Sequence, residues 1–365
     1  MPDSPSLDFV VEKKDLRRTA FVEGAHSTDT VLEPGQVLLR IARFALTANN
    51  VTYGAVGDAF GYWRFFPGPE GFGRIPVWGF ADVERSRCDG LAPGERIFGY
   101  WPISTHTVLV PERVSPAGFV EAAPHRAGLP PFYNQYSRVA ADPGYDRSRE
   151  PHLALFRPLF TTSFLIDDAF AERAWLGARS LVISSASSKT ALGLAFLAAQ
   201  AKRGLAEIVG LTSAGHRGFV SGTGYYDRVL SYDEIDALAP GTPSLFVDVA
   251  GNTRVLAAVH RRLGDGLRHS CRVGAAHWEA RAPVEALPGP EPVLFFAPDQ
   301  GSKRAAEWGA AGLQARVAGA MARFFDSSSR WLRIVEGRGP EAVEAAYRAY
   351  VDGKADPAEG HVLSL

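Results

Sequence analysis

The spacing of hydrophobic and polar positions changes near residue 161, which separates two kinds of sequence in this chain. Before that point, short runs rich in β-branched and aromatic residues alternate with turn signals such as Glu33-Pro34-Gly35 and Ala92-Pro93-Gly94. Frequent glycine and proline between short strands favour a β-barrel or β-sandwich over α/β units. The runs that we expect to form strands are 9–15, 36–47 and 95–101.

A proline-rich stretch follows between residues 124 and 160. It contains Pro124, Pro130-Pro131, Pro143-Gly144 and Pro151, and it is polar around residue 145. Because proline removes a backbone donor and interrupts both helices and strands, we expect a long connection or an inserted excursion here.

From residue 161 onward, helical and strand patterns alternate. Strands that alternate with helices predict a parallel sheet that helices cover on both faces. After residue 301 the pattern is helical again, and a last short strand follows. The expected strands are 179–185, 207–213, 228–235, 244–251, 268–276, 292–298 and 358–365, and the expected helices are 164–177, 189–204, 215–224, 252–266, 303–331 and 341–353.

Composition narrows the possible function classes. The chain has 365 residues and a net charge of −1, with both signs mixed along its length, so it offers no basic stripe for nucleic acid. Its two cysteines, Cys88 and Cys271, exclude a disulfide framework and fit a reducing cytosol. The N-terminus has no signal-peptide pattern, and the longest apolar run, 191–201, is too short to span a bilayer. We therefore expect a soluble cytoplasmic protein without a membrane partner.

The segment 181–200 joins a strand pattern to an apolar helix, as a nucleotide-binding unit does. Ser185, Ser188 and Ala191 stand at the spacing where such units carry glycines. Serine hydroxyls can donate to phosphate, the helix N-terminus favours an anion, and Lys189 adds a positive charge. The segment therefore predicts a phosphate-binding loop formed by Ser185, Ser187, Ser188, Lys189 and Thr190.

Three other interpretations of this turn remain open. Lys189-Thr190 suggests a Walker A loop, but neither glycine of that motif is present. A nucleophilic serine at position 185 or 188 would need a base nearby, and the glycines of a nucleophile elbow are missing. The simplest alternative is a serine-rich helix N-cap that binds no ligand.

The ends of the following strands indicate which dinucleotide would bind. The strand 207–213 ends at Thr212 and Ser213, where NAD-preferring folds place an acid, and Arg217 follows closely. Because a hydroxyl and a guanidinium suit a 2′-phosphate, NADP(H) is the expected cofactor. The expected cofactor-binding set is completed by residues at or near the ends of later strands, namely Tyr232, Gly251, Gly274 and Phe295.

The chain contains the strings LFTTSFLIDD, SSASSKTALGLAF, VGLTS, GYYDRVLSYD and VDVAGN. With these strings it resembles the medium-chain dehydrogenase/reductase superfamily, in particular the zinc-independent quinone oxidoreductase and enoyl reductase branch. It is most similar to a bacterial family of unknown function related to that branch. The resemblance implies an α/β fold with a GroES-like β-rich catalytic domain (1–160, including the connection at 124–160), a doubly wound Rossmann NADP-binding domain (161–300) and a helical return (301–365) that packs on the catalytic domain.

The same resemblance implies candidate residues in the first domain. Asn50 matches the asparagine of a substrate-side motif in quinone reductases, and Tyr53 lies near the position of their aspartate. Both are candidate catalytic residues, with Asn50 orienting cofactor or substrate. Tyr53 is either a hydrogen-bond donor or proton source or an ordinary aromatic residue of the barrel, and the proton could equally come from water. Aromatic residues of the segment 58–73 either belong to the ordinary core or line a pocket for an apolar or aromatic substrate, with an arginine available for a carboxylate. The expected pocket residues are Tyr62, Trp63, Arg64, Phe66 and Tyr133.

Zinc is not expected, because two isolated cysteines cannot form a structural site and the Gly-His-Glu of zinc-dependent relatives is absent. Without a Lewis acid, conjugate reduction of an activated C=C bond is the more suitable chemistry. We therefore expect an NADPH-dependent reductase of an enone, a quinone or an enoyl ester or thioester, and family resemblance suggests a homodimer. The alternative is a protein that binds NADP(H) as a sensor or partner without turnover.

Overall fold

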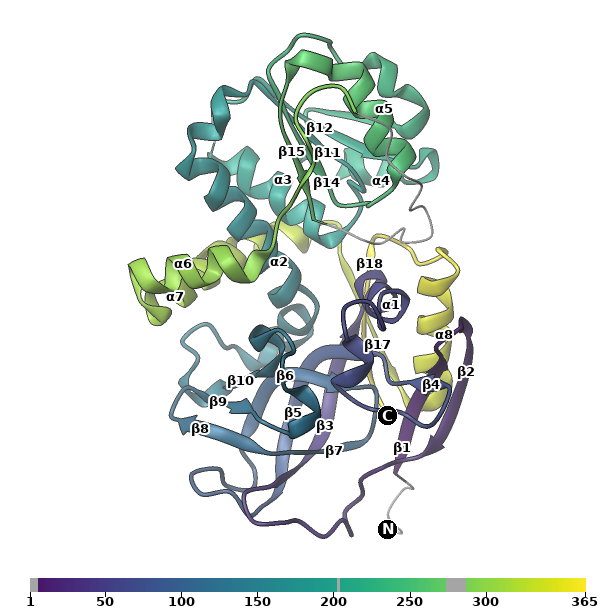
Figure 1. The fold of residues 1–365 in the computed structure, drawn as a ribbon, viewed down its shortest axis with the longest axis vertical. Helices are drawn as coiled ribbons and strands as arrows, with labels where there is room; N and C mark the ends of the chain where they lie inside the picture. The colour runs from purple at the N-terminus through teal and green to yellow at the C-terminus, as the bar shows by residue number, and fades with distance from the viewer. Residues whose placement is uncertain (1–5, 202–203, 274–286) are drawn as a thin grey trace. The chain divides into compact units, whose positions relative to one another are not determined.

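The computed structural model describes residues 6–201, 204–273 and 287–365. The chain forms two compact units, each of which has its own sheets (Figure 1). Unit 1 contains the residues up to 155 together with 334–365, and unit 2 contains residues 156–333. The expected boundaries at 160 and 300 therefore shift: the helical segment 301–333 belongs to unit 2, and only the residues from 334 onward return to unit 1.

Unit 1 is built from antiparallel strands, in agreement with its short β-branched and aromatic runs. Strand β3 is central, because β5 pairs with one of its edges while β7 and β18 share the other. The large sheet has the order β17 (Arg333–Arg338), β18 (Glu359–Ser364), β3 (Val37–Leu46), β5 (Pro76–Ser86), β6 (Arg96–Pro102), β10 (Gln135–Arg138), β9 (Gly118–Glu121) and β8 (Pro111–Ser115), with β7 (His106–Leu109) beside β3; a smaller sheet has the order β2 (Asp15–Glu23), β1 (Leu7–Glu12) and β4 (Phe72–Gly73).

The core of unit 1 combines residues of both sheets with one face of α8 (Gly339–Val351). Phe9, Trp101 and Tyr347 are fully buried there, and the remaining helix, α1 (Ala48–Ala55), follows β3 directly. Burial of such aromatic side chains contributes most of the hydrophobic stabilisation of a sheet core.

The proline-rich stretch 124–160 is not a single long connection. It contains strand β10 and the first half of α2 (Glu150–Glu172), a helix of 23 residues with Pro158 inside it. The helix continues because Phe156 and Phe160 are fully buried against Phe324, which offsets the backbone hydrogen bond lost at the proline. The other short elements of this stretch are the 3₁₀ turns η2 (Pro124–Arg126), η3 (Pro131–Asn134), η4 (Val139–Ala141) and η5 (Arg147–Arg149).

Unit 2 contains the doubly wound parallel sheet that the alternating pattern predicted. Its strands have the order β13-β12-β11-β14-β15-β16, and all neighbours are parallel. Numbered along this unit, that order is 3-2-1-4-5-6, the order of the Rossmann fold. The elements are β11 (Ser180–Ile183), β12 (Glu207–Thr212), β13 (Arg228–Ser231), β14 (Ser244–Asp248), β15 (Leu267–Arg272), β16 (Val293–Leu294), α3 (Lys189–Ala201), α4 (Arg217–Gly222), α5 (Thr253–Leu263), α6 (Ala297–Trp308), α7 (Ala310–Ser328) and the 3₁₀ turns η6 (Ala174–Gly177), η7 (Ala214–His216), η8 (Tyr232–Ala237) and η9 (Gly264–Gly266).

Several strands of unit 2 are shorter than the sequence predicted, and the following element explains this for two of them. The expected strand 228–235 ends at Ser231, because Ser231 and Glu234 form a capping box that starts the 3₁₀ turn η8. The expected strand 292–298 contributes only β16 before α6 begins, with a proline in its first turn.

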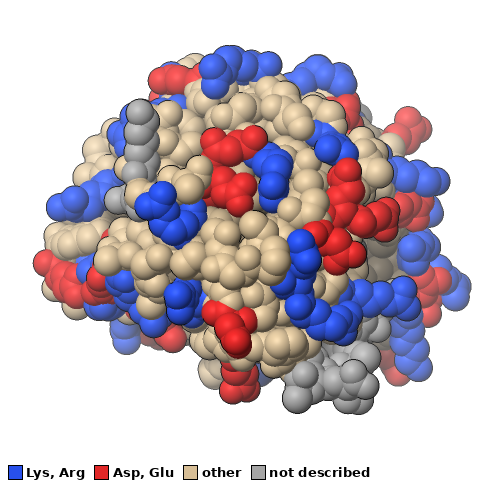
Figure 2. Space-filling view, turned by 90° about the horizontal axis from the view of Figure 1, so that it is seen from above, with Lys and Arg blue, Asp and Glu red and all other residues tan. Residues whose placement is uncertain are grey.

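Within the described residues, no helix has both the length and the hydropathy required to cross a membrane. Figure 2 shows one face of the molecule, on which Lys and Arg side chains are interspersed with Asp and Glu side chains. This face therefore has no large patch of a single charge sign that would attract a polyanion.

Candidate functional site

The carboxyl ends of β11 and β14 meet where the sheet order of unit 2 reverses, which is where such folds bind ligands. The hydroxyl of Ser184, after β11, donates to Asp248 Oδ1 at 2.7 Å. The same hydroxyl accepts from the N–H groups of Val249 and Ala250 at 3.0 and 3.1 Å, and the N–H of Gly251 donates to Asp248 Oδ1 at 3.1 Å. These buried contacts fix the loops after β11 and β14 to each other.

The turn between β11 and α3 lacks glycine, but one of its residues has a backbone conformation that glycine usually provides. Ser185 has a φ of 51°, in the left-handed region that favours glycine. Ser188 Oγ accepts from the N–H of Ala191 at 3.3 Å and thereby caps α3. Close packing is provided by the next strand, since a Cβ on Gly210 would lie 2.9 Å from the Cβ of Ala186.

The other residues of the predicted phosphate loop surround the start of α3. Ser187 Oγ lies 3.2 Å from His216 Nδ1, which joins this turn to the turn after β12. Lys189 and Thr190 are the first residues of α3, and the Lys189 ammonium lies 6.0 Å from the centre of the Trp331 ring. The partial positive charge of the helix N-terminus and the lysine together favour an anion.

Arg217, the expected 2′-phosphate ligand, forms an ion pair in this structure. Its Nη1 donates to both carboxylate oxygens of Glu234 at 2.9 Å. Ser213, the other expected residue at this end of β12, is exposed. Glu234 was not expected at this place from the sequence. Its contact with Arg217 bears on the choice between NADP(H) and NAD(H).

Three further residues of the expected cofactor set have the following places. Tyr232 Oη accepts from the N–H of Ser185 at 3.1 Å; burial raises the pKa of this phenol, and the hydrogen bond only partly opposes that effect. Gly251 follows β14 with a φ of 66°, and Phe295 is half-buried just after β16. Gly274 lies outside the described residues. Tyr232 and Gly251 therefore lie at the switch point, next to the turn that contains Ser185.

In unit 1, four tyrosines from four separate elements form one cluster. Tyr53 belongs to α1, Tyr62 to the 3₁₀ turn η1 (Tyr62–Arg64), Tyr100 to β6 and Tyr133 to η3. The ring centres of Tyr53 and Tyr62 lie 4.5 Å apart, and those of Tyr100 and Tyr133 lie 4.8 Å apart. The hydroxyls of Tyr62 and Tyr133 are hydrogen-bonded at 3.0 Å. Three of the expected site residues (Tyr53, Tyr62 and Tyr133) therefore come together.

The cluster keeps its phenols protonated at neutral pH. Burial raises the pKa of all four tyrosines, because a phenolate would lose its hydration. Tyr53 and Tyr100 are buried, and Tyr100 Oη has no hydrogen-bond partner among the described residues. Tyr62 and Tyr133 are only partly buried, so they are the two members of the cluster that lie nearest to solvent.

Asn50 and Arg64 have structural contacts that the sequence analysis did not foresee. Asn50 is buried; its Oδ1 accepts from the N–H of Thr47 and its Nδ2 donates to the carbonyl of Pro76, both at 2.8 Å. Its amide is therefore used in capping α1 and anchoring it to β5. Arg64 is exposed, and its guanidinium donates to the carbonyl of Ala127 at 2.9 Å.

Trp63 and Phe66 also belong to the interior. A Cβ on Gly57 or Gly73 would lie 2.2 or 2.3 Å from Trp63, so these glycines form a slot that the indole fills within the core. Phe66 is buried beneath Arg126, whose guanidinium carbon lies 4.5 Å from the ring centre. Both side chains therefore pack in unit 1, where a substrate-lining role was expected.

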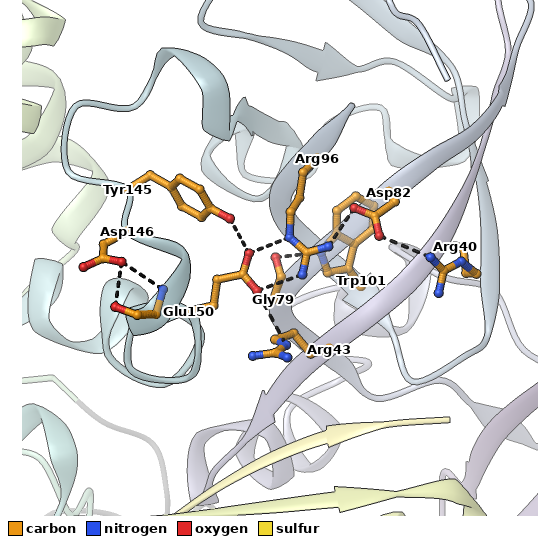
Figure 3. A network of polar contacts seen from close by, with 10 residues as sticks. Arg40, Arg43, Gly79, Asp82, Arg96, Trp101, Tyr145, Asp146 and Glu150 are labelled. Atoms are coloured by element: carbon orange, nitrogen blue, oxygen red, sulfur yellow. Dashed lines mark hydrogen bonds and ion pairs between the residues drawn. The ribbon is translucent and has the colours of Figure 1, made fainter. Parts of the chain in front are cut away.

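A second polar network fixes the start of α2 to the large sheet (Figure 3). Glu150 is buried and accepts from Arg96 Nε and Nη2 at 2.5 and 2.8 Å and from Tyr145 Oη at 2.5 Å. Arg96 also donates to Asp82 at 2.7 Å, and Arg43 lies 3.6 Å from Glu150. Burial alone would raise the pKa of Glu150, but the hydrogen bonds from Arg96 and Tyr145 and the nearby arginine charges lower it.

Unit 1 contains a cavity of about 480 Å³ beside the middle of β3. Its lining carries charges of both signs and does not include the aromatic residues expected to form a substrate pocket; the charged side chains are Arg40, Arg43, Arg338, Glu84 and Glu336. In the described part of the chain, no group of three or more His, Cys, Asp or Glu side chains is placed to hold a metal ion.

Several residues that shape these sites were not predicted from the sequence. Glu234 had a readable signal, because Ser231 and Glu234 have the Ser-x-x-Glu spacing of a capping box. Ser184 and Glu150 had none, since Asp248 and Arg96, to which they are hydrogen-bonded, are far away in sequence.

Comparison with known proteins adds the family and the fold. A family model described as "Protein of unknown function (DUF2855)" matches residues 44–356. No curated protein matches the chain in sequence. Among solved structures, CurA from Vibrio vulnificus in complex with NADPH has a TM-score of 0.62 at 14% identity, over 98% of both chains.

Two further solved structures have the same architecture. A mutant form of enoyl thioester reductase from Candida tropicalis has a TM-score of 0.57 at 10% identity over 100% of both chains. The yhdH oxidoreductase from Salmonella enterica, in complex with NADP, has a TM-score of 0.55 at 15% identity over 98% of this chain and 99% of that one. The chain therefore has the two-domain fold of these reductases.

Proposed function

The chain belongs to the DUF2855 family, and we propose that it is an NADPH-dependent reductase that transfers a hydride to an activated C=C bond without zinc. The observation that carries the proposal is the turn after β11. It lies at the switch point of a 3-2-1-4-5-6 sheet, adopts the backbone geometry of a glycine loop at Ser185 and leads into α3 at Lys189.

The donor set of unit 2 fits a dinucleotide. The N-terminus of α3, Lys189 and the hydroxyl of Ser187 would hold the pyrophosphate, and the close packing of Gly210 on Ala186 lets the turn lie near the sheet. Gly251, at the end of β14, leaves room for backbone to approach the ribose. Bound NADPH would supply the hydride.

The tyrosine cluster of unit 1 supports the proton-donating half of the reaction. Reduction of an enone, a quinone or an enoyl ester or thioester leaves an oxygen that gains negative charge, and hydroxyl donors stabilise that charge. Tyr62 and Tyr133 are protonated and partly exposed, so Tyr62 would donate to the substrate while Tyr133 holds its hydroxyl in place. Tyr53, buried beneath them, would position the Tyr62 ring.

Titration with NADPH followed by NADPH oxidation against a panel of enones, quinones and enoyl thioesters tests the proposal. Saturable binding and oxidation with at least one acceptor class are expected. Tight binding without oxidation of any acceptor would instead favour the NADP(H)-binding sensor. Covalent labelling of Ser185 or Ser188 by a fluorophosphonate would instead support a nucleophilic serine.

The reductase is expected to keep its full activity after dialysis against a zinc chelator.

Replacing Lys189 by alanine is expected to weaken NADPH binding about tenfold to a hundredfold, because a charged donor to the pyrophosphate is lost. The measurement is the dissociation constant from NADPH fluorescence. The control is Lys303→Ala in the same unit, where the lysine forms a surface pair with Glu172 at 2.5 Å. Equal affinity in the Lys189 variant and the wild type would contradict the loop assignment.

Resemblance to dimeric reductases leads us to propose a homodimer that takes a small apolar or aromatic substrate. Light scattering of the purified protein tests the oligomeric state. A monomer at all concentrations would contradict this part of the proposal without affecting the reductase chemistry.

A further inference from the structure

Arg217 is engaged by an acid at the place where a 2′-phosphate would be recognised. Its Nη1 lies 2.9 Å from both oxygens of Glu234, and the two side chains are 49% and 39% exposed. An arginine that recognises a phosphate uses the same donors that this carboxylate now occupies. The carboxylate of Glu234 therefore occupies the Arg217 donors that a 2′-phosphate would need.

The backbone fixes the position of Glu234. Its Oε2 accepts from the N–H of Ser231 at 2.8 Å, and the two residues form the capping box that starts η8. Ser231 is paired with Thr212 in the parallel register of β13 and β12, so both chain segments leave the sheet at the same level. The end of β12 is the position from which dinucleotide-binding folds contact the adenosine ribose. Glu234 thus reaches the ribose end of the proposed site from the neighbouring strand.

The charge of Glu234 persists at neutral pH. The Ser231 N–H, and after it the Arg217 guanidinium, lower the pKa of this carboxyl despite some desolvation. Asp233, the residue before it, belongs to the same 3₁₀ turn, but no hydrogen bond or ion pair to Arg217 involves it.

We propose that Glu234 determines dinucleotide specificity: it competes with the 2′-phosphate of NADP(H) for Arg217 and accepts the ribose 2′-hydroxyl of NAD(H). This inference rests on the proposed function. An exposed ion pair contributes little by itself, so a phosphate can separate it. The carboxylate stays nearby, however, because Ser231 holds it, and it repels a dianionic phosphate. The wild-type protein is therefore expected to prefer NADPH over NADH by less than about tenfold.

Dissociation constants of NADPH and NADH, measured by calorimetry on the full chain, test the inference. Glu234→Gln keeps an acceptor for Ser231 and removes the charge, so NADPH affinity is expected to rise about tenfold while NADH affinity stays the same or falls. Arg217→Gln is expected to lower NADPH affinity about tenfold and leave NADH affinity nearly unchanged. The gain in Glu234→Gln should shrink as salt is raised from 0.05 to about 0.5 M, because screening weakens the repulsion.

Asp233→Asn is the matched control, since it removes the same charge from the adjacent position of the same turn. It is expected to change NADPH affinity less than threefold. An equal gain in NADPH affinity in Glu234→Gln and Asp233→Asn would show that only the net charge matters, and it would overturn the inference. An equal change in NADPH and NADH affinity in Glu234→Gln would also overturn it. Binding of neither dinucleotide to wild type or variants, with unchanged thermal unfolding, would contradict the proposed function itself.

Discussion

Tyr62→Phe is expected to lower turnover in NADPH-dependent reduction about a hundredfold, while the dissociation constant of NADPH stays unchanged. The substitution keeps the ring that packs on Tyr53 at 4.5 Å and removes the hydroxyl that bonds Tyr133 at 3.0 Å. The substrate oxygen would then lose its donor in the transition state, and the loss should appear in kcat more than in KM. Single-turnover oxidation of NADPH at saturating acceptor gives the measurement.

The pH profile provides a second measurement on the same residue. Burial raises the pKa of Tyr62 above its ordinary value, so the neutral, donating form persists through the whole neutral range. Turnover should therefore show no loss from ionisation of Tyr62 between about pH 6 and pH 9, because it falls only as pH rises through the raised pKa. Tyr350→Phe is the control, since its hydroxyl contacts His361 in another part of unit 1. If Tyr62→Phe kept the turnover of the wild type, water or another group would be the donor to the substrate.

Glu150→Ala is expected to lower the free energy of unfolding by about 3–5 kcal/mol, which is the effect of removing one partner of a buried ion pair. The Glu150 side chain is 2% exposed and that of Arg96 is 17% exposed, so the guanidinium would remain largely desolvated. Asp82 would still neutralise part of its charge at 2.7 Å, which places the expected loss at the lower end of the range. Urea unfolding followed by circular dichroism measures the change.

The control for this prediction is Glu344→Ala, which removes a glutamate from an exposed pair with Arg348 at 2.7 Å. The expected loss there is below about 1 kcal/mol, because solvent screens such pairs. Since the folded state lowers the pKa of Glu150, its stabilising contribution is complete above the ordinary glutamate pKa and disappears as pH falls through the lowered value. Acid destabilisation should therefore be weaker in Glu150→Ala than in the wild type. If Glu150→Ala and Glu344→Ala lowered the free energy of unfolding equally, the Glu150 ion pair would contribute no more than an exposed pair does.

The sheet of unit 2 could be predicted because each of its strands is a local apolar run followed by a local turn. The sequence also located the turn at Ser185 and the end of β12, because both are defined by position along the chain. It could not predict that Glu234 would engage Arg217, since that contact depends on which strand lies beside β12. Arg217 and Glu234 can be identified in the sequence, but the order of the strands in the sheet determines that they are neighbours.

Unit 1 was less predictable, because its side chains are sorted by packing across long sequence separations. The rings of Tyr53 and Tyr133 are in contact although the two residues are 80 positions apart in the sequence. Nothing in the local sequence pattern distinguishes these two tyrosines from Trp63. What sends Trp63 into the core is the space left by Gly57 and Gly73, which only the folded backbone reveals. Asn50 was assigned by resemblance, whereas its spacing from Thr47 was the better guide to its capping role.

The pairing of β18 with β3 has a consequence for how the chain acquires its structure. His361 lies opposite Leu46 and Leu363 opposite Phe44, so the large sheet closes across more than 300 positions of sequence. Unit 2, in contrast, is one continuous stretch of chain. During synthesis unit 2 can therefore complete its fold while β3 of unit 1 still lacks its pairing with β18 and exposes that part of its edge.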